Sequence, residues 1–152
     1  MNPCYSLLAV LLLGACAGPP EPLVVKQFQL RDQVPNTVDE PMVSMEKSRR
    51  LRGAVSMEER RNRLGQYYTL IWDDRNGVGQ GEVELILQYQ QGGTASLVKR
   101  MVRSFPASTP DGKAEFAIIG EDYFKNGKVL TWKATLQRGK KVIATKQSYL
   151  WQ

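Results

Sequence analysis

The feature that most constrains the fold is an alternation of apolar and polar residues that recurs through the second half of the chain. Residues 82–89 place an apolar or aromatic side chain at every second position, and residues 129–137 repeat the pattern. Successive side chains of a β-strand point to opposite faces, so the alternation predicts strands with one buried face. Glycine-containing turns separate these segments, including one at residues 120–128. Strands are predicted at residues 23–30, 67–72, 82–89, 97–105, 114–118, 129–137 and 142–151.

Seven short strands with regular turns favour a β-sandwich. Residues 66–152 resemble an immunoglobulin or fibronectin type III-type domain in the strand around Trp132, the R-G-K-K hairpin and the closing S-Y-L-W segment. The resemblance implies a mostly β, immunoglobulin/fibronectin type III-like sandwich of about seven strands. Trp72, Trp132 and Trp151 are predicted to lie in its core or at the core edge. On residues 129–137 the side chains predicted to face inward are Leu130, Trp132, Ala134 and Leu136.

A short helical insertion is predicted after the first strand. Residues 31–43 contain two prolines and are predicted to form an irregular connection, and residues 44–64 then favour two short helices. Ser56 and Glu59 have the spacing of a capping box, which would begin the second helix. Gly65 is predicted to end that helix.

Seven basic residues give this insertion most of the excess charge of the chain. Because three glutamates offset them, residues 44–65 carry +4 of the formal net charge of +6. One interpretation is a solvated helix face with ion pairs such as Glu46–Arg50 and Glu58–Arg61. Because solvated side chains contribute little to the core, replacing Arg49, Arg50, Arg60 and Arg61 together should leave the fold intact. The other is contact with an anionic surface or an acidic partner, which salt would weaken. The candidate contact residues are Lys47, Arg49, Arg50, Arg52, Arg60, Arg61 and Arg63.

The first sixteen residues have the features of a bacterial lipoprotein signal. The apolar run 7–13 is shorter than a membrane-spanning helix and has the length of a signal-peptide h-region. The sequence Leu13-Gly14-Ala15-Cys16 resembles the lipobox of bacterial lipoproteins. This resemblance implies cleavage before Cys16, a diacylglycerol on its sulfur and further acylation, which together anchor a protein to a membrane. The alternative is an ordinary buried apolar segment.

The lipoprotein resemblance also sets the expected location and organisation. Ala17, which follows the cysteine, favours the outer membrane of the cell envelope. Residues 50–68 and 132–144 are similar to uncharacterised envelope lipoproteins of Verrucomicrobia-like bacteria, which implies a type of protein and no activity. The expected organisation is a lipoprotein signal peptide (1–15), a proline-rich tether (16–22), a first strand, irregular connection and basic helices (23–65), and a β-sandwich core (66–152).

Catalytic chemistry has few candidates in this sequence. There is no histidine, and the two cysteines, Cys4 and Cys16, both precede the predicted domain. Catalytic triads, Cys-His pairs and most transition-metal sites are therefore excluded, and neither a metal nor a cofactor is expected. A carboxylate-only hydrolase and a loose calcium site in residues 73–82 remain alternatives. The acidic candidates for the hydrolase are Asp73, Asp74, Glu82, Glu84, Asp111, Glu121 and Asp122.

These observations favour a non-enzymatic function. The expected protein is a membrane-anchored envelope lipoprotein that acts as a protein-binding or scaffolding component. Its expected partners are the membrane, through lipidated Cys16, and another envelope protein; nucleic acid is not expected at this location. The alternative is a lipid- or glycan-binding envelope module, which needs a concave pocket of roughly 300 Å³ or more with apolar and aromatic walls.

Overall fold

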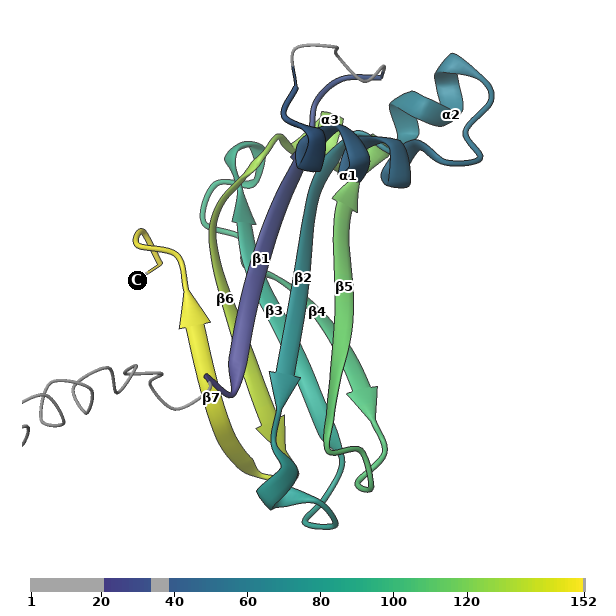
Figure 1. Cartoon of the computed structure of the whole chain (residues 1–152). Helices are drawn as coiled ribbons and strands as arrows, with labels where there is room; N and C mark the ends of the chain where they lie inside the picture. The colour runs from purple at the N-terminus through teal and green to yellow at the C-terminus, as the bar shows by residue number, and fades with distance from the viewer. Residues whose placement is uncertain (1–20, 34–38, 152) are drawn as a thin grey trace, which may run out of the picture.

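The computed structural model describes residues 21–33 and 39–151, which form seven β-strands and three α-helices (Figure 1). The predicted signal peptide and Cys16 lie outside these residues. The strands are β1 (Leu23–Leu30), β2 (Gly65–Asp73), β3 (Val83–Gln91), β4 (Lys99–Phe105), β5 (Asp111–Ile119), β6 (Val129–Arg138) and β7 (Lys141–Gln147). The helices are α1 (Pro41–Leu51), α2 (Met57–Asn62) and α3 (Gly120–Asn126).

The strands form two antiparallel sheets that pack face to face (Figure 1). The three-stranded sheet has the order β1-β2-β5, and the four-stranded sheet has the order β4-β3-β6-β7. This arrangement confirms the predicted β-sandwich of seven strands with a helical insertion after the first strand. Strand β1, which precedes the helical insertion, pairs along its whole length with β2, which follows the insertion. The strand β1 is therefore part of the sandwich.

The inner faces of the two sheets enclose the main hydrophobic core. Alternation along β2 directs Tyr68, Leu70 and Trp72 inward, as the period of a strand requires. The rings of Tyr68 and Trp132 lie 5.9 Å apart in a tilted contact that joins the two sheets. Trp72 and Trp132 are buried, as predicted, and Trp151 is partly buried.

A second apolar cluster lies on the outer face of the three-stranded sheet, beneath the helices. Leu30 and Tyr67 reach it from the strands, Leu51 reaches it from α1, and Leu64 lies just before β2. Leu23, at the other end of β1, belongs to the main core. The two faces of β1 therefore contribute side chains to different clusters. The helices cover one half of this outer face and leave the other half uncovered (Figure 1).

Helix α3 occupies the segment that the sequence predicts to be a turn. Gly120 and Gly127 bound it with φ values of +61° and +77°, conformations that favour glycine. Glu121 and Asp122 lie in its first turn and Lys125 in its last, as the helix dipole favours. A helix of seven residues is too short to produce the apolar repeat by which helices are recognised in a sequence.

Leu130 is exposed, although the alternation predicts that it faces inward. The register between β3 and β6 shifts at this point, because Gln90 pairs with Thr131 whereas Gln91 pairs with Val129. Leu130 falls in the resulting irregularity, and an extra residue of this kind re-aims the side chains around it. Thr131 is buried instead, and its hydroxyl group donates a hydrogen bond to the side-chain oxygen of Gln90 at 3.0 Å.

Gly65 brings the chain back into the sheet after α2. Its direct cross-strand partner is Leu30, the last residue of β1, so the insertion leaves and re-enters the sheet at one point. Its φ is +146°, and an added Cβ would lie 2.2 Å from the carbonyl oxygen of Ile118. The prediction that Gly65 ends the second helix is wrong, because α2 ends at Asn62 and Gly65 opens β2.

Candidate functional site

The predicted basic residues gather at one end of the three-stranded sheet, on α1, on α2, on the link between them and directly after α2 (Figure 1). All seven lie within the described part of the chain, whereas Cys16, the predicted lipid attachment residue, does not. Most of the seven side chains bond or stack against other parts of the protein. The side chain of Arg52 is exposed and has no bonding partner among the described residues.

Lys47 is buried, with 6% of its surface exposed. Its Nζ lies 2.8 Å from Asp32 Oδ2 and 2.7 Å from Asp39 Oδ2. The hydrogen bonds to Asp32 and Asp39 raise the pKa of Lys47 above its ordinary value. These ion pairs join α1 to the chain segment that precedes it, so the ammonium group is not available to a membrane surface.

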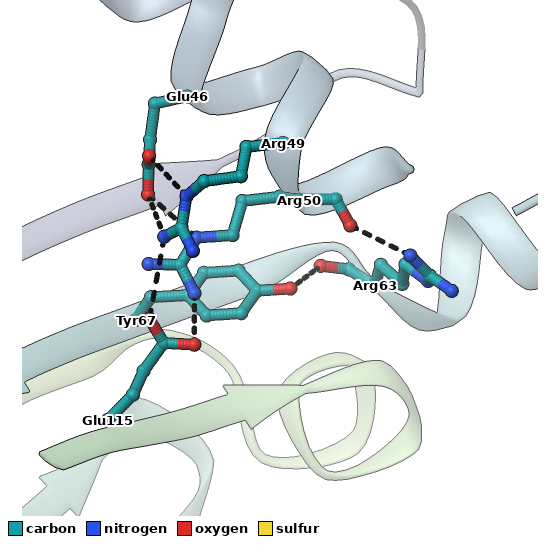
Figure 2. A network of polar contacts seen from close by, with 6 residues as sticks. All are labelled: Glu46, Arg49, Arg50, Arg63, Tyr67 and Glu115. Carbon is teal, nitrogen blue, oxygen red and sulfur yellow. Dashed lines mark hydrogen bonds and ion pairs between the residues drawn. The ribbon is translucent and has the colours of Figure 1, made fainter. Parts of the chain in front are cut away.

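Arg50 lies between α1 and the three-stranded sheet, with 7% of its surface exposed (Figure 2). Its Nε lies 2.8 Å from Glu46 Oε1 on α1, and its Nη1 pairs with Glu115 of β5. Its guanidinium carbon stands 4.0 Å from the centroid of the Tyr67 ring, which is a cation-π contact. One side chain thus connects the helix to both β2 and β5.

Arg49 extends this network to the protein surface (Figure 2). Its Nη2 lies 2.6 Å from Glu46 Oε1 and 3.5 Å from Glu115 Oε2, and nearly half of its side chain is exposed. The hydrogen bond from Arg49, supported by that from Arg50, outweighs the opposing effect of partial burial and lowers the pKa of Glu46 to about 2. Glu46 therefore stays ionised well below neutral pH.

Replacing Glu46 with glutamine is expected to lower the free energy of unfolding by about 1 kcal/mol at pH 7, as for a partly exposed ion pair. The pKa of the folded state, about 2, lies below the ordinary value of 4.5, so the stabilisation is complete above about pH 4.5 and is lost as the pH falls toward 2. Denaturant unfolding of the wild type and of Glu46→Gln between pH 7 and pH 2 should show the difference shrinking in that window.

Glu58 is the matched control for this measurement, because it is an exposed acid on α2 without an ion pair among the described residues. Glu58→Gln is expected to change the free energy of unfolding by less than about 0.5 kcal/mol. A difference between the wild type and Glu46→Gln that stays constant down to pH 2 would contradict the role given to the Glu46 carboxylate.

Helix α2 is fixed at both ends. Ser56 Oγ accepts a hydrogen bond from the amide of Glu59 at 3.1 Å, and the Glu59 carboxylate accepts one from the amide of Ser56 at 2.9 Å, which confirms the predicted capping box. Arg60 donates to a backbone carbonyl of the link before the helix. The guanidinium carbon of Arg61 stands 4.9 Å from the centroid of the Phe124 ring on α3.

Arg63 joins the end of α2 to the end of α1 (Figure 2). Its Nη1 donates to the carbonyl oxygens of Arg50 at 3.0 Å and Arg52 at 2.5 Å. The hydroxyl group of Tyr67 donates to the carbonyl oxygen of Arg63 at 2.6 Å. Because carbonyls at a helix C-terminus lack partners within the helix, Arg63 supplies donors that α1 otherwise would not have.

The interpretation of the cluster as a solvated helix face is wrong for Lys47 and Arg50, because both side chains are buried. The Glu46–Arg50 ion pair is confirmed. The Glu58–Arg61 pair does not form among the described residues. Because Arg50 is a buried cation shared by two carboxylates, we expect its substitution to destabilise the fold.

The uncovered half of the outer face of the three-stranded sheet carries two rows of side chains, each crossing all three strands. The rows are Lys26–Thr69–Glu115 and Val24–Ile71–Lys113. Beside them stands the N-terminal half of α1, where Met42 and Met45 are 76% and 68% exposed. We define the open face as the residues Val24, Lys26, Met42, Met45, Ile71 and Lys113.

Two hollows lie along the open face. One, of about 470 Å³, lies between α1 and the sheet and is lined in part by Met42 and Met45. The other, of about 450 Å³, lies toward the beginning of β1, near Arg75. Ile71 and Lys113 line both, so the two hollows adjoin. Their size falls in the range of ligand-binding sites.

The open face carries positive charge that no neighbouring residue offsets. Lys26 and Lys113 are exposed and have no ion pair or hydrogen bond among the described residues. The nearby acids Glu46 and Glu115 are already bonded to arginines. Two ammonium groups therefore stand beside exposed methionines, and this combination suits an acidic, partly apolar ligand.

Three of the acids predicted for a hydrolase or calcium site, Asp73, Asp74 and Asp111, are paired with arginines. Asp74 Oδ2 lies 2.6 Å from Nε of the buried Arg138. Arg75 lies 3.2 Å from Asp73 and 3.6 Å from Asp111. Within residues 21–33 and 39–151, no group of three or more His, Cys, Asp or Glu side chains is placed to hold a metal ion.

The open face is not apparent from the sequence. Residues 31–43 are predicted to form an irregular connection, whereas the structure places Met42 on α1. The usable signal is the spacing of Met42, Met45 and Arg49, which puts the three side chains on one face of a helix. Their position over the sheet has no local signal, because it depends on packing between distant segments.

Comparison with known proteins gives no match to any family model, curated protein or solved structure. No helix in the described part of the chain is long and apolar enough to cross a membrane.

Proposed function

We propose that this protein is a membrane-anchored envelope lipoprotein whose sandwich binds another protein and is not an enzyme. The observation that carries the proposal is the open face, where Met42 and Met45 are exposed beside two lysines that have no partner in the described part of the chain. Contiguous exposed apolar surface rimmed by polar groups is typical of interaction sites. Flexible methionine side chains adapt to the shape of a partner. The lipobox ending at Cys16 supports the anchor.

The proposed anchor determines which end of the sandwich lies near the membrane. Residues 16–22 can span at most about 25 Å, at about 3.3–3.6 Å per residue. The eight residues of β1 then extend about 27 Å from the tethered end, and the basic helices lie beyond its far end (Figure 1). The helices therefore lie away from the anchor, and the open face lies along the flank of the sandwich, where a partner in the same compartment can reach it.

A lipid- or glycan-binding module is the second candidate. It is favoured by the volume of the adjoining hollows, about 450 and 470 Å³, and by Phe28 in the lining of the larger one. The charged residues of the lining, which include Lys26 and Lys113, fit a phosphate or carboxylate headgroup as well as a protein. Identifying what contacts the open face distinguishes the two candidates.

Site-specific photo-crosslinking tests the proposal. A benzophenone amino acid replaces Met45 on the open face, and in a control it replaces Val142, an exposed residue of the four-stranded sheet. Irradiation of cells that produce the full chain should give a discrete protein adduct from position 45 and none from position 142. The proposal fails if position 45 gives no protein adduct. A lipid or glycan adduct at that position would favour the second candidate.

A further inference from the structure

The arrangement of charge on the open face indicates what kind of protein segment it binds. Building on the proposed function, we infer that the open face binds an extended acidic peptide segment, with two carboxylates at positions i and i+4 and an apolar side chain at i+2. The segment belongs to the partner protein and lies across the sheet, beside α1.

The lysines set the spacing of the two acids. Lys26 is directly opposite Thr69, and Lys113 is directly opposite Ile71, two residues further along β2. With strands about 4.8 Å apart and a rise of about 3.4 Å per residue, the two lysine Cα atoms are separated diagonally by about 12 Å. Side chains i and i+4 of an extended chain point to the same side about 14 Å apart. The flexible lysine side chains cover the difference.

The apolar position follows from what lies between the lysines. Ile71 shares a row with Lys113, and α1 brings Met42 and Met45 over the same region to form the larger hollow. A side chain at i+2 of the bound segment points to the same side as its two acids and so meets Ile71 and the methionines. Burial of this side chain adds affinity that charge pairing alone does not provide.

Among the described residues, the acids near the two lysines already have cationic partners. Glu115 lies in the same row as Lys26 but is bonded to Arg50, and Glu46 on α1 is bonded to Arg49 and Arg50. Exposed ion pairs are individually weak, so binding depends on both lysines and on the apolar contact together. The inference therefore predicts that changing any one of the three contacts weakens binding.

A fluorescein-labelled peptide containing Glu-Thr-Leu-Thr-Glu tests the inference by fluorescence polarisation with the purified full chain in neutral detergent. Saturable binding is expected, and it should weaken as salt is raised. Lys26→Glu and Lys113→Glu should each weaken binding by about tenfold or more, and Met45→Ser by severalfold. Lys140→Glu is the matched control, because Lys140 is an exposed lysine in the turn between β6 and β7, and it should bind within about twofold of the wild type.

Four results would overturn the inference: no saturable binding, equal binding by the lysine variants, equal binding of a Lys-Thr-Leu-Thr-Lys peptide, or lysine-dependent binding of phosphatidylglycerol vesicles in place of the peptide. Thermal unfolding of each variant shows whether the sandwich is intact. The crosslink at position 45 reports separately on the proposed function. If the peptide fails while the protein adduct persists, only the inference about the bound segment is overturned.

Discussion

Replacing Arg138 with methionine is expected to lower the free energy of unfolding by about 3–5 kcal/mol, because the change leaves the largely buried Asp74 carboxylate without its cation. Arg138 is 3% exposed, and its Nε lies 2.6 Å from Asp74 Oδ2. Its Nη atoms donate to the carbonyl oxygens of Gly81, Ala107 and Thr109 at 3.2, 3.0 and 3.0 Å. One guanidinium group thus holds the β2–β3 and β4–β5 loops together. Urea unfolding of the wild type and of Arg138→Met measures the difference in the free energy of unfolding.

Lys140 provides the control, since it is an exposed cation in the hairpin that follows Arg138. Lys140→Met is expected to change the free energy of unfolding by less than about 0.5 kcal/mol. Combining Arg138→Met with Asp74→Asn should recover part of the loss, because an amide needs no counterion. A loss below about 1 kcal/mol for Arg138→Met alone would show that the loops do not depend on this ion pair.

The proposed lipid anchor predicts that Cys16→Ser abolishes incorporation of a labelled fatty acid. Each buried methylene group contributes about 0.8 kcal/mol to membrane binding, so two or more acyl chains hold a protein firmly. The wild type should therefore stay in the membrane fraction after washing with high salt. The variant should appear in the soluble fraction or accumulate as an uncleaved precursor. Radiolabelling and cell fractionation measure the two effects.

Cys4 serves as the control, because it is the other cysteine of the chain and lies in the proposed signal peptide. Cys4→Ser should be labelled, cleaved and retained in the membrane like the wild type. Persistent labelling of Cys16→Ser would show that the lipid is attached elsewhere. Any membrane association of the protein would then depend on a residue other than Cys16.

The sandwich is predictable from the sequence because strand formation leaves a local signal. Alternation over residues 82–89 and 129–137 identifies the two central strands of the four-stranded sheet, and glycine-rich turns separate the other strands. The capping box at Ser56 is equally local, and it identifies the beginning of α2. Such signals arise within a few residues, so a single sequence carries them.

The burial of the basic residues is not predictable in this way. Arg50 pairs with Glu46 one helical turn away, which the sequence reveals, but also with Glu115 on β5, which only the packing of α1 on the sheet brings close. The outward turn of Leu130 likewise depends on a register shift between two strands. Both features are set by contacts between segments far apart in the chain, and charge or alternation alone does not encode them.

Because Leu30 pairs directly with Gly65, the strands of the sandwich do not depend on the length of the insertion between these two residues. The chain leaves the sheet at one residue of a cross-strand pair and returns at the other, so the intervening segment can change in length without moving a strand. Lengthening a loop costs little free energy, because the closure entropy grows only slowly with length. In evolutionary terms, α1 and its two exposed methionines can diverge while selection on the sandwich remains constant.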